Sequence, residues 1–556
     1  MSSMNRRSVL RSAVGTAGAV AVSGAAAATA EAAPAGNAAP AATARSTGPT
    51  TGSVPPAPSV TASDARYPEL VRGVNQRWVA APDAVRLVTT ADQVLQIVQD
   101  AATAGKRVAV RSGGHCYCDF VSNAQTQIII DLSAMHAITY DTERCAFSVE
   151  AGAQLGQVYE VLYREWGVTV PGGVCPSVGI GGHATGGGFG LLTRQFGLVA
   201  DYIEAVEAVV VDSRRKAHRI VASRNPSDPN HDLWWAVTGG GGGSFGVITR
   251  YWFRSADATG SNPSAQLPAP PKSILLSSVG APWATVSQDQ FTQLVTNFTN
   301  WYLANSAAGS DLLGLSGVLL AKARSGGGLG LLTQIDASIP DAADVLAEYG
   351  QAVTAGTGIT TPFLGRPVNW LASTKLVALN NPVLLYDPTM RSAIKTAWTK
   401  QNFTDAQLAT IYQQLLRTDF DNANATLQLA GAGGRMNQVD RTATASVHRD
   451  AVLFAEFETF WVSPADDAAN LAWLRDIYGR TFADTGGYPV PGDRFDGTYI
   501  NNPDTDITDP AYNISGVPWT TLYWGENYPR LQQAKAAFDP TDFFRHAQSV
   551  RLPGAS

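Results

Sequence analysis

The chain has 556 residues, of which 45% are hydrophobic and 15% charged, and its formal net charge is −6. This composition supports large buried cores and argues against a disordered chain, a coiled coil or a protein that mainly binds nucleic acid. Four cysteines in so long a chain exclude a disulfide scaffold. Beyond residue 30, no apolar run reaches the roughly 18 residues of a membrane span, so none is expected in the mature protein.

The N-terminus has the pattern of an export signal followed by a linker. Arg6 and Arg7 precede a Gly- and Ala-rich apolar stretch, which is typical of a twin-arginine signal over residues 1–30. Residues 31–65 are rich in Ala, Pro, Gly, Ser and Thr and predict a disordered linker. We therefore expect an exported protein, secreted or held in the cell envelope, whose ordered part begins near residue 66.

Strands and helices alternate in the next part of the chain. A helix is expected to begin at an N-cap formed by Thr90 or Asp92 and to end at Gly105. A second helix is expected over residues 155–165. The strands expected around these helices are 85–89, 107–111, 127–132, 147–150 and 206–211. This alternation predicts an α/β domain over residues 66–258.

Three glycine-dense segments follow apolar runs in this domain, at residues 112–115, 179–190 and 239–246. Glycine lets backbone N–H groups approach a phosphate without steric conflict from a Cβ atom. None of the segments fits a Rossmann fingerprint or a Walker loop. Together they predict a dinucleotide bound along one edge of a sheet.

From residue 272 to residue 461 the pattern changes to longer strands and amphipathic helices. The expected strands are 273–278, 312–320, 331–338 and 452–461, and the expected helices are 288–302, 341–355 and 405–416. This second region differs in kind from the first and predicts a separate domain.

Four separated motifs resemble those of FAD-linked oxidases of the vanillyl-alcohol oxidase and p-cresol methylhydroxylase superfamily, most closely the berberine-bridge-enzyme branch. They are Arg111–Tyr117, Gly172–His183, Asn527–Leu531 and Asp539–Val550. The resemblance covers residues 66–552 and implies an α+β fold, with a two-part FAD-binding domain and an antiparallel-sheet substrate domain backed by helices. The implied boundaries are 66–258 for FAD binding, 259–505 for substrate binding and 506–556 for a segment that returns to the FAD domain.

The resemblance implies FAD bonded twice to the protein, through its 8α-methyl carbon to His115 and through ring carbon 6 to Cys175. Val178 matches the position that admits O2 to the flavin, which favours an oxidase over a dehydrogenase. The other cofactor-binding residues implied are Arg111, Ser112, Gly113, Gly114, Gly179, Gly182, Gly187, Gly188, Val247, Asn527 and Tyr528. No metal site is expected, and the roles of Cys116, Cys118 and Cys145 stay open, including a disulfide with Cys145.

The catalytic base is where the sequence departs from the family pattern. The two tyrosines common in relatives correspond to Phe189 and Asn502, and neither a phenyl ring nor an amide can act as a base. Glu456 lies on an expected strand, where period two places it on one face with Glu458 and opposite Phe457. A carboxyl buried beside a flavin has a raised pKa and can accept a proton. Glu456 is therefore the predicted base, with Glu458 beside it and Tyr499 as an alternative.

The function implied is that of an exported oxidase that removes hydride from an alcohol carbon of a secondary or glycosylated metabolite and reduces O2 to H2O2. One alternative is a sugar or oligosaccharide oxidase. Another is oxidative cyclisation or desaturation of a natural product, which suits a carboxylate base. A third is a non-catalytic flavin- or ligand-binding protein, which the missing tyrosines favour. The expected partners are a small-molecule substrate and O2.

Overall fold

A computed structural model describes residues 54–307, 309–379 and 389–554. The predicted export signal and most of the predicted linker lie outside the described residues. The last part of that linker is ordered, because Ser59–Val60 forms strand β1, which pairs antiparallel with β2 (Ala84–Leu87). Val60 is fully buried in a small apolar cluster with Val85. Ordered structure therefore begins earlier than the composition of this segment predicts.

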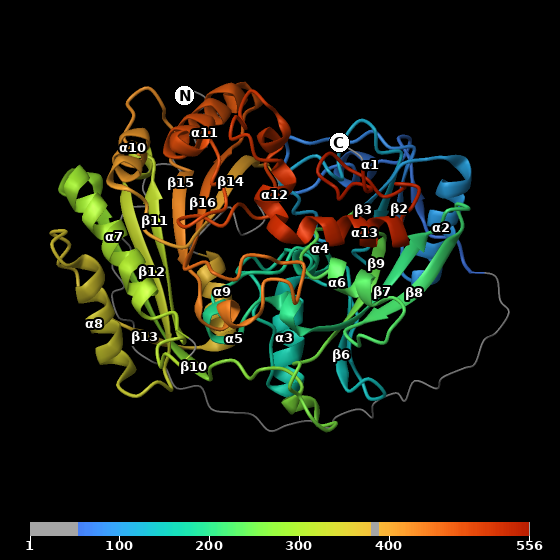
Figure 1. Cartoon of the computed structure of the whole chain (residues 1–556), viewed down its shortest axis with the longest axis horizontal. Coiled ribbons are helices and arrows are strands. Elements are labelled where there is room, and N and C mark those ends of the chain that lie inside the picture. The colour runs from blue at the N-terminus through green and yellow to red at the C-terminus, as the bar shows by residue number, and fades with distance from the viewer. Residues whose placement is uncertain (1–53, 308, 380–388, 555–556) are drawn as a thin grey trace, which may run out of the picture. The chain divides into compact units, whose positions relative to one another are not determined.

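Two sheets form the N-terminal part of the described chain (Figure 1). In the first, β2 and β3 (Val108–Arg111) flank β4 (Ile128–Asp131) in parallel, and β1 is the antiparallel edge. The second is antiparallel, in the order β5-β6-β9-β7-β8. Its strands are β5 (Ile138–Asp141), β6 (Ala146–Glu150), β7 (Ile203–Val211), β8 (Ala217–Ser223) and β9 (Val247–Phe253).

Helices cover these two sheets and connect their strands. α2 (Ala91–Ala104) packs on β7 and β8. The side chain of Thr90 caps it by accepting a hydrogen bond from the backbone of Gln93, and Gly105 ends it with φ = 66°. The other helices here are α1 (Tyr67–Leu70), α3 (Leu155–Trp166), α4 (Ile180–Thr185), α5 (Thr193–Phe196) and α6 (His231–Ala236).

A seven-stranded antiparallel sheet forms the second part, in the order β13-β10-β12-β11-β15-β16-β14. Its strands are β10 (Ser273–Pro282), β11 (Leu315–Lys322), β12 (Gly328–Asp336), β13 (Arg366–Asn369), β14 (Arg391–Thr399), β15 (Ala425–Gly431) and β16 (Leu453–Trp461). The helices that back it are α7 (Gln288–Ala304), α8 (Ala342–Thr354), α10 (Asp405–Leu415) and α11 (Asp467–Thr481), at the left and top of Figure 1. α9 (Trp370–Leu379) contacts β10 and β13 of this sheet and also α3. This architecture confirms the predicted α+β fold with a helix-backed antiparallel sheet.

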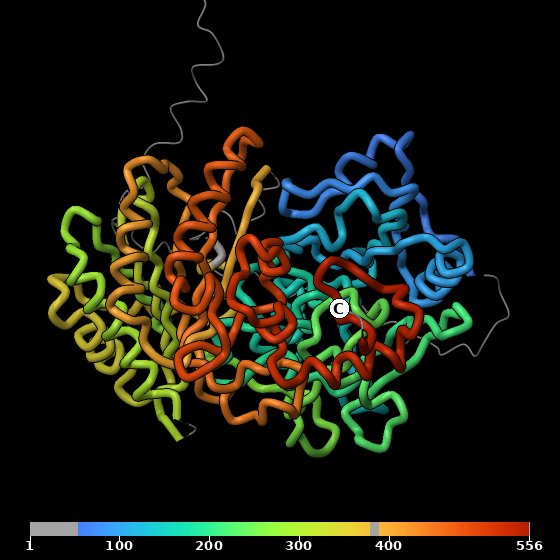
Figure 2. The backbone as a smooth tube through the Cα atoms, turned by 45° about the horizontal axis from the view of Figure 1, so that its top comes forward, coloured from blue at the N-terminus to red at the C-terminus, as the bar shows by residue number. Residues whose placement is uncertain are grey.

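The C-terminal segment runs back over the first part of the chain, as the red tube in Figure 2 shows. It contains α12 (Trp519–Trp524) and α13 (Tyr528–Phe538), and α13 packs on α6. The ammonium group of Lys535 is fully buried, pairs with Asp539 at 2.7 Å and donates to the carbonyl oxygens of Ser244 and Phe544. The third glycine segment is therefore fixed to the chain terminus.

Candidate active site

A cavity of about 410 Å³ lies between the glycine-rich turns and the inner face of the seven-stranded sheet. Its volume is within the range of about 300–1,000 Å³ that is usual for small-molecule and cofactor sites. One wall contains residues 112–115, residues 179, 181 and 182, and residues 240–246, which belong to the three glycine segments. The other wall contains side chains of β11, β14, β15 and β16. The topology thus brings the predicted dinucleotide turns and the predicted catalytic strand to one space.

The first two glycine turns touch each other through their backbones. A Cβ atom on Gly113 would lie 2.3 Å from the backbone nitrogen of Gly179, and one on Gly179 would lie 2.0 Å from Oγ of Ser112. Ser112 fixes its own turn by donating to the carbonyl oxygen of Ala151 at 2.6 Å. Only glycine fits these positions, and the result is a cradle of exposed backbone that suits the pyrophosphate of FAD.

Arg111 lines the cavity, but its guanidinium is already bound by protein groups. It pairs with Asp131 of β4 and donates to the carbonyl oxygens of Leu70 and Arg72 at 2.6 and 2.8 Å. These bonds hold the end of β3 against its neighbours. Arg111 therefore supports the turn, and the backbone of the turn faces the cavity.

The two predicted anchors, His115 and Cys175, line the cavity and meet at one hydroxyl. Oγ of Ser177 lies 2.7 Å from Nε2 of His115 and 3.4 Å from Sγ of Cys175. Burial lowers the pKa of His115 to about 4, so the imidazole is neutral at pH 7. Burial also raises the pKa of Cys175, and hydrogen bonds from Ser177 and the nearby backbone oppose that rise. Ser177 was not predicted from the sequence, although it stands two residues after Cys175.

Two carboxyls project into the cavity from β16. Glu456 and Glu458 line it, whereas Phe457 faces the other way and packs on Tyr478 of α11 with ring centroids 5.4 Å apart. Burial raises the pKa of Glu456 to about 7, and a hydrogen bond of 3.0 Å from the amide of Asn502 limits the rise. Burial and the charge of Glu456 raise the pKa of Glu458 well above its usual range. At neutral pH the pair therefore combines a partly ionised carboxyl with a protonated one.

Amides accompany both carboxyls. Nε2 of Gln428, on β15, donates to Glu458 at 2.9 Å, and in the strand register Gln428 stands opposite Glu456. Asn502, where the family pattern has a tyrosine, contacts the predicted base directly. Both amides line the cavity, and sequence analysis assigned neither of them a role.

Two tyrosines also line the cavity. The hydroxyl oxygen of Tyr499 accepts hydrogen bonds from the backbone of Gly188 at 2.8 Å and from the amide of Asn501 at 2.9 Å. Burial nevertheless raises the pKa of Tyr499 to about 12. Burial and the charges of Glu458 and Glu456 raise the pKa of Tyr117 well above its usual range. Tyr117 was not predicted as a site residue, although it stands two positions after His115 in the first motif.

The remaining cofactor-binding predictions divide into two groups. Val178, Gly179 and Gly182 line the cavity that the described residues form. The others, Gly187, Gly188, Val247, Asn527 and Tyr528, are not among the residues that line it.

Packing accounts for the positions outside the cavity lining. Val247 is fully buried in β9, and the ring of Tyr528 stacks on that of Trp524 at 5.5 Å. The amide of Asn527 donates to the carbonyl oxygen of Arg441 at 2.8 Å. Gly188 would place a Cβ atom 2.7 Å from Val199. The structure therefore gives these residues roles in packing and hydrogen bonding.

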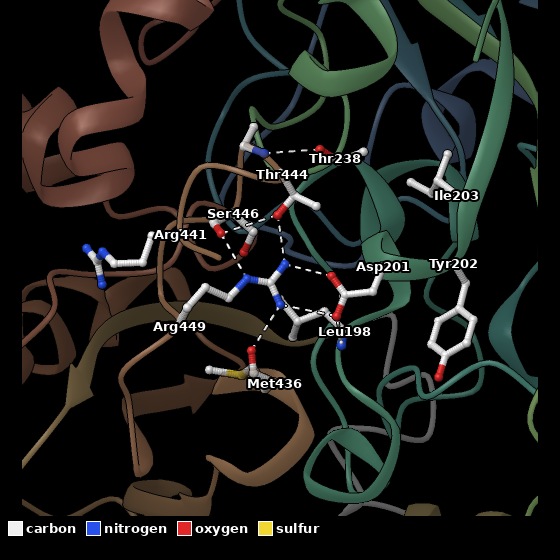
Figure 3. Close-up of polar contacts among 12 residues, drawn as sticks. Leu198, Asp201, Tyr202, Ile203, Thr238, Met436, Arg441, Thr444, Ser446 and Arg449 are labelled. Atoms are coloured by element: carbon white, nitrogen blue, oxygen red, sulfur yellow. Dashed lines mark hydrogen bonds and ion pairs between the residues drawn. The ribbon is translucent and has the colours of Figure 1, made fainter. Parts of the chain in front are cut away.

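A buried ion pair explains why the glycines near residue 187 have little space. Arg449, whose side chain is 1% exposed, pairs with Asp201 at 2.7 Å and also donates to Thr444 and to the carbonyl oxygen of Ser446 (Figure 3). This pair fixes the segment around Ser446, and a Cβ atom on Gly187 would lie 3.1 Å from Oγ of Ser446. Figure 3 shows the guanidinium enclosed by these partners.

The other cysteines have no assigned chemistry. Cys116, Cys118 and Cys145 are free thiols, so the disulfide considered with Cys145 does not form. Cys118 is buried and donates from Sγ to the carbonyl oxygen of Pro503 at 3.1 Å. Within the described residues, no group of three or more His, Cys, Asp or Glu side chains is arranged to hold a metal ion. No helix in that part of the chain has the length and apolar character needed to cross a membrane.

Comparison with known proteins gives matches over nearly the whole described chain. A family model for an FAD binding domain matches residues 82–215, and one described as berberine and berberine like matches residues 498–551. The aclacinomycin-N/aclacinomycin-A oxidase of Streptomyces galilaeus is 46% identical over 492 residues, which cover 88% of this chain and 89% of that protein.

Two solved structures share the fold closely. CrmK, a flavoenzyme of caerulomycin biosynthesis, superposes with a TM-score of 0.87 at 43% identity, over 90% of this chain and 100% of the solved chain. A glycopeptide hexose oxidase solved in complex with teicoplanin gives a TM-score of 0.83 at 43% identity, with the same coverage. Each of these similarities extends over nine-tenths of this chain.

Proposed function

Because the chain belongs to the berberine-bridge-enzyme-like family of FAD-dependent oxidases, we propose that it oxidises an alcohol carbon of a natural product or a glycosylated metabolite. FAD, when bound, supplies the acceptor for the hydride, and O2 then takes up the electrons as H2O2. One observation carries the proposal: the glycine cradle, His115, Cys175 and a carboxyl with a pKa of about 7 all line one cavity.

Glu456 removes the hydroxyl proton of the substrate. A base works best when its pKa lies near the working pH, and a pKa of about 7 meets that condition. Glu458 keeps its proton at neutral pH, so it donates a hydrogen bond to a substrate oxygen. Tyr499, with a pKa of about 12, stays a phenol and suits binding better than proton removal.

FAD is attached through His115 and Cys175 in this proposal. The support is that both side chains line the cavity next to the glycine cradle, and that His115 is neutral and therefore nucleophilic. The turn that carries Gly113 and Gly114 would hold the pyrophosphate, and Val178, which also lines the cavity, would leave room for O2.

Two other substrate classes fit specific features of the cavity. The two carboxyls with Gln428 and Asn502 form an acid–amide set of the kind that binds hydroxyl groups, which favours a sugar or oligosaccharide. A carboxylate base also serves oxidative cyclisation or desaturation of a natural product. A carbonyl-trapping reagent separates oxidation of a primary or secondary alcohol, which forms a new aldehyde or ketone, from cyclisation or desaturation, which does not. The compounds that release H2O2 then separate sugars from other natural products. The similarity to named oxidases argues against the non-catalytic alternative, and a base at Glu456 would remove the reason for it, which was the missing tyrosines.

Export by the twin-arginine route is part of the proposal, on the basis of Arg6, Arg7 and the apolar stretch that follows them. Replacing both arginines by lysine should retain the protein inside the cells of a host that has this pathway. Appearance of the doubly substituted protein outside the cytoplasm would show that the pair is not the signal.

Covalent attachment of the flavin to the protein is the first point to test. Mature protein is precipitated with acid, and the pellet is examined by intact mass and by absorbance. We expect flavin to stay with the polypeptide in the wild type, in H115A and in C175A, and to wash out only from the double variant. A flavin that washes out of the wild type would contradict the attachment. Release of H2O2 is then screened with free sugars and with glycosylated and aglycone natural products.

A further inference from the structure

The side chain of Ser177 hydrogen-bonds both proposed anchors. It is 2% exposed and lies in the turn between Cys175 and α4. Its hydroxyl oxygen is 2.7 Å from Nε2 of His115 and 3.4 Å from Sγ of Cys175, both within hydrogen-bond range for these atoms. His115 comes from a different glycine turn, 62 residues away. The hydroxyl therefore joins two nucleophiles that the sequence keeps far apart.

The direction of the two bonds follows from the number of protons present. A hydroxyl has one proton to donate, and a sulfur that is to act as a nucleophile must receive it, because a thiolate only accepts. Oγ of Ser177 must then accept from Nε2 of His115, which fixes the neutral imidazole as the Nε2–H tautomer. Nδ1 is left with its lone pair, and no hydrogen bond joins it to another described residue.

We propose that Ser177 positions both anchors for attachment to the flavin, accepting a hydrogen bond from Nε2–H of His115 and donating one to Sγ of Cys175. This inference rests on the covalent attachment in the proposed function. Ser177 acts through the two anchors, so it is a positioning residue and not a catalytic one. Through it, His115 presents Nδ1 and Cys175 presents sulfur to the same cavity.

The chemistry balances with O2 as the oxidant. Each attachment replaces one N–H or S–H bond and one flavin C–H bond by one N–C or S–C bond. The two protons and two electrons released at each attachment reduce one O2 to H2O2. When Nδ1 forms its bond, Nε2 gives up its proton, which joins the proton of the flavin C–H bond and two electrons in reducing O2. Ser177 is thus unchanged by the first attachment, and the thiol loses its proton in the second.

A merely structural serine would not affect the acidity of Cys175, so the first readout needs no flavin. Full-length apoprotein from a riboflavin-starved host is alkylated with iodoacetamide over a range of pH, and labelling of Cys175 is followed by peptide mass. We expect S177A to raise the midpoint by about one pH unit, because the thiolate loses a hydrogen bond from a hydroxyl. S177T keeps the hydroxyl and should restore the wild-type midpoint.

The second readout is the rate of attachment. Apoprotein is mixed with FAD in air, and the fractions with one and with two bonds are followed by intact mass and peptide mapping. We expect S177A to slow both bonds at least about tenfold, an effect within the range of a positioned proton-transfer group, and S177T to restore them. S148A is the matched control, because Ser148 is also a buried serine, its hydroxyl accepts a hydrogen bond from Arg250, and it does not line the cavity. It should keep the wild-type ratio of double to single attachment.

The outcomes separate this inference from the proposed function. If the wild type gains two bonds and S177A gains them at the same rate with the same Cys175 midpoint, the role of Ser177 is refuted. If the wild type gains no bond at all, the proposed attachment fails, and the alkylation midpoint still shows whether Ser177 bonds the thiol. Binding of FAD without a bond, measured by flavin fluorescence, shows whether S177A folds. If it does not fold, the similarly shaped pair S177T and S177V decides: a higher midpoint and slower attachment in S177V than in S177T support the inference, and equal values in the two variants refute it.

Discussion

Substituting Glu456 by glutamine removes the proposed base with little change in shape. Glutamine has nearly the volume of a protonated glutamate, and its amide oxygen can still accept the hydrogen bond that Asn502 donates to Glu456. What is lost is the ability to take a proton. A positioned general base contributes about 10²–10⁴-fold to rate, so E456Q should slow reduction of the flavin by substrate by about that factor.

The pKa of Glu456 also sets a pH dependence. A base must be ionised to work, so the rate should rise with pH through about 7 and level off above it. Near pH 5, two units below that pKa, about 1% of the carboxyls are ionised, so the rate should be about a hundredfold below the plateau. Asn502→Leu removes a donor that favours the ionised form, so the midpoint should move up by about one unit.

Anaerobic stopped-flow measurement of flavin reduction is the assay, because it excludes the reaction with O2. E458Q is the matched control: Glu458 is protonated at neutral pH and glutamine imitates that form, so the midpoint near 7 should persist. If E456Q keeps the wild-type rate, or keeps the inflection near pH 7, Glu456 is not the base. If the midpoint of the pH dependence rises in N502L and stays unchanged in E458Q, the inflection near pH 7 belongs to the titration of Glu456.

Three further substitutions test the surroundings of the cavity. Y499F should leave the midpoint near pH 7 in place while lowering stability by about 1–3 kcal/mol in urea denaturation, because Gly188 N–H loses its acceptor. R449M should cost about 3–5 kcal/mol by leaving Asp201 unpaired, and R449M/D201N should recover part of that loss. K395M should cost a similar amount by leaving Asp504 and Asp506 without their buried partner, and the loss should shrink as the pH falls towards the lowered pKa of Asp506, about 2, and that carboxylate becomes protonated. Equal stability of R449M or K395M and the wild type at neutral pH would contradict these accounts.

Local signals were sufficient for much of the fold. The cap at Thr90 and the glycine at 105 bound α2 as expected, and the period-two pattern gave the cavity-facing residues of β16. These features depend on short-range geometry, in which side-chain direction and capping are decided within a few residues. The glycine turns of the first two motifs were found in the same way.

Strand β14 was not expected because its stability depends on distant residues. Lys395 lies in the middle of this strand and is 3% exposed. A buried ammonium group is unfavourable unless it is paired, and its partners, Asp504 and Asp506, lie more than a hundred positions later. A short stretch of sequence around Lys395 does not include these two carboxylates. The sequence near the lysine therefore gives no reason to expect a buried strand. The ion pair also anchors the loop that carries Asn502.

A motif position can require glycine for either of two physical reasons, and the sequence alone does not show which reason applies. Gly113 and Gly179 form the cradle itself, whereas Gly187 and Gly188 leave room for Ser446 and Val199. The packing around Gly187 and Gly188 depends on the ion pair between Arg449 and Asp201, which are 248 positions apart in the sequence. For this reason the resemblance groups glycines that line the cavity with glycines whose positions are explained by packing.

The change at position 502 is best understood together with Glu456. Burial alone raises the pKa of a carboxyl, and a base whose pKa is far above 7 would stay protonated at neutral pH. The amide of Asn502 donates to Glu456 and stabilises its ionised form, an interaction that opposes the effect of burial. A tyrosine at this position could itself take the substrate proton, whereas an asparagine makes the neighbouring carboxyl fit for that task. The absence of the family tyrosine is therefore consistent with catalysis by a different group, and N502L distinguishes this coupling from a passive contact.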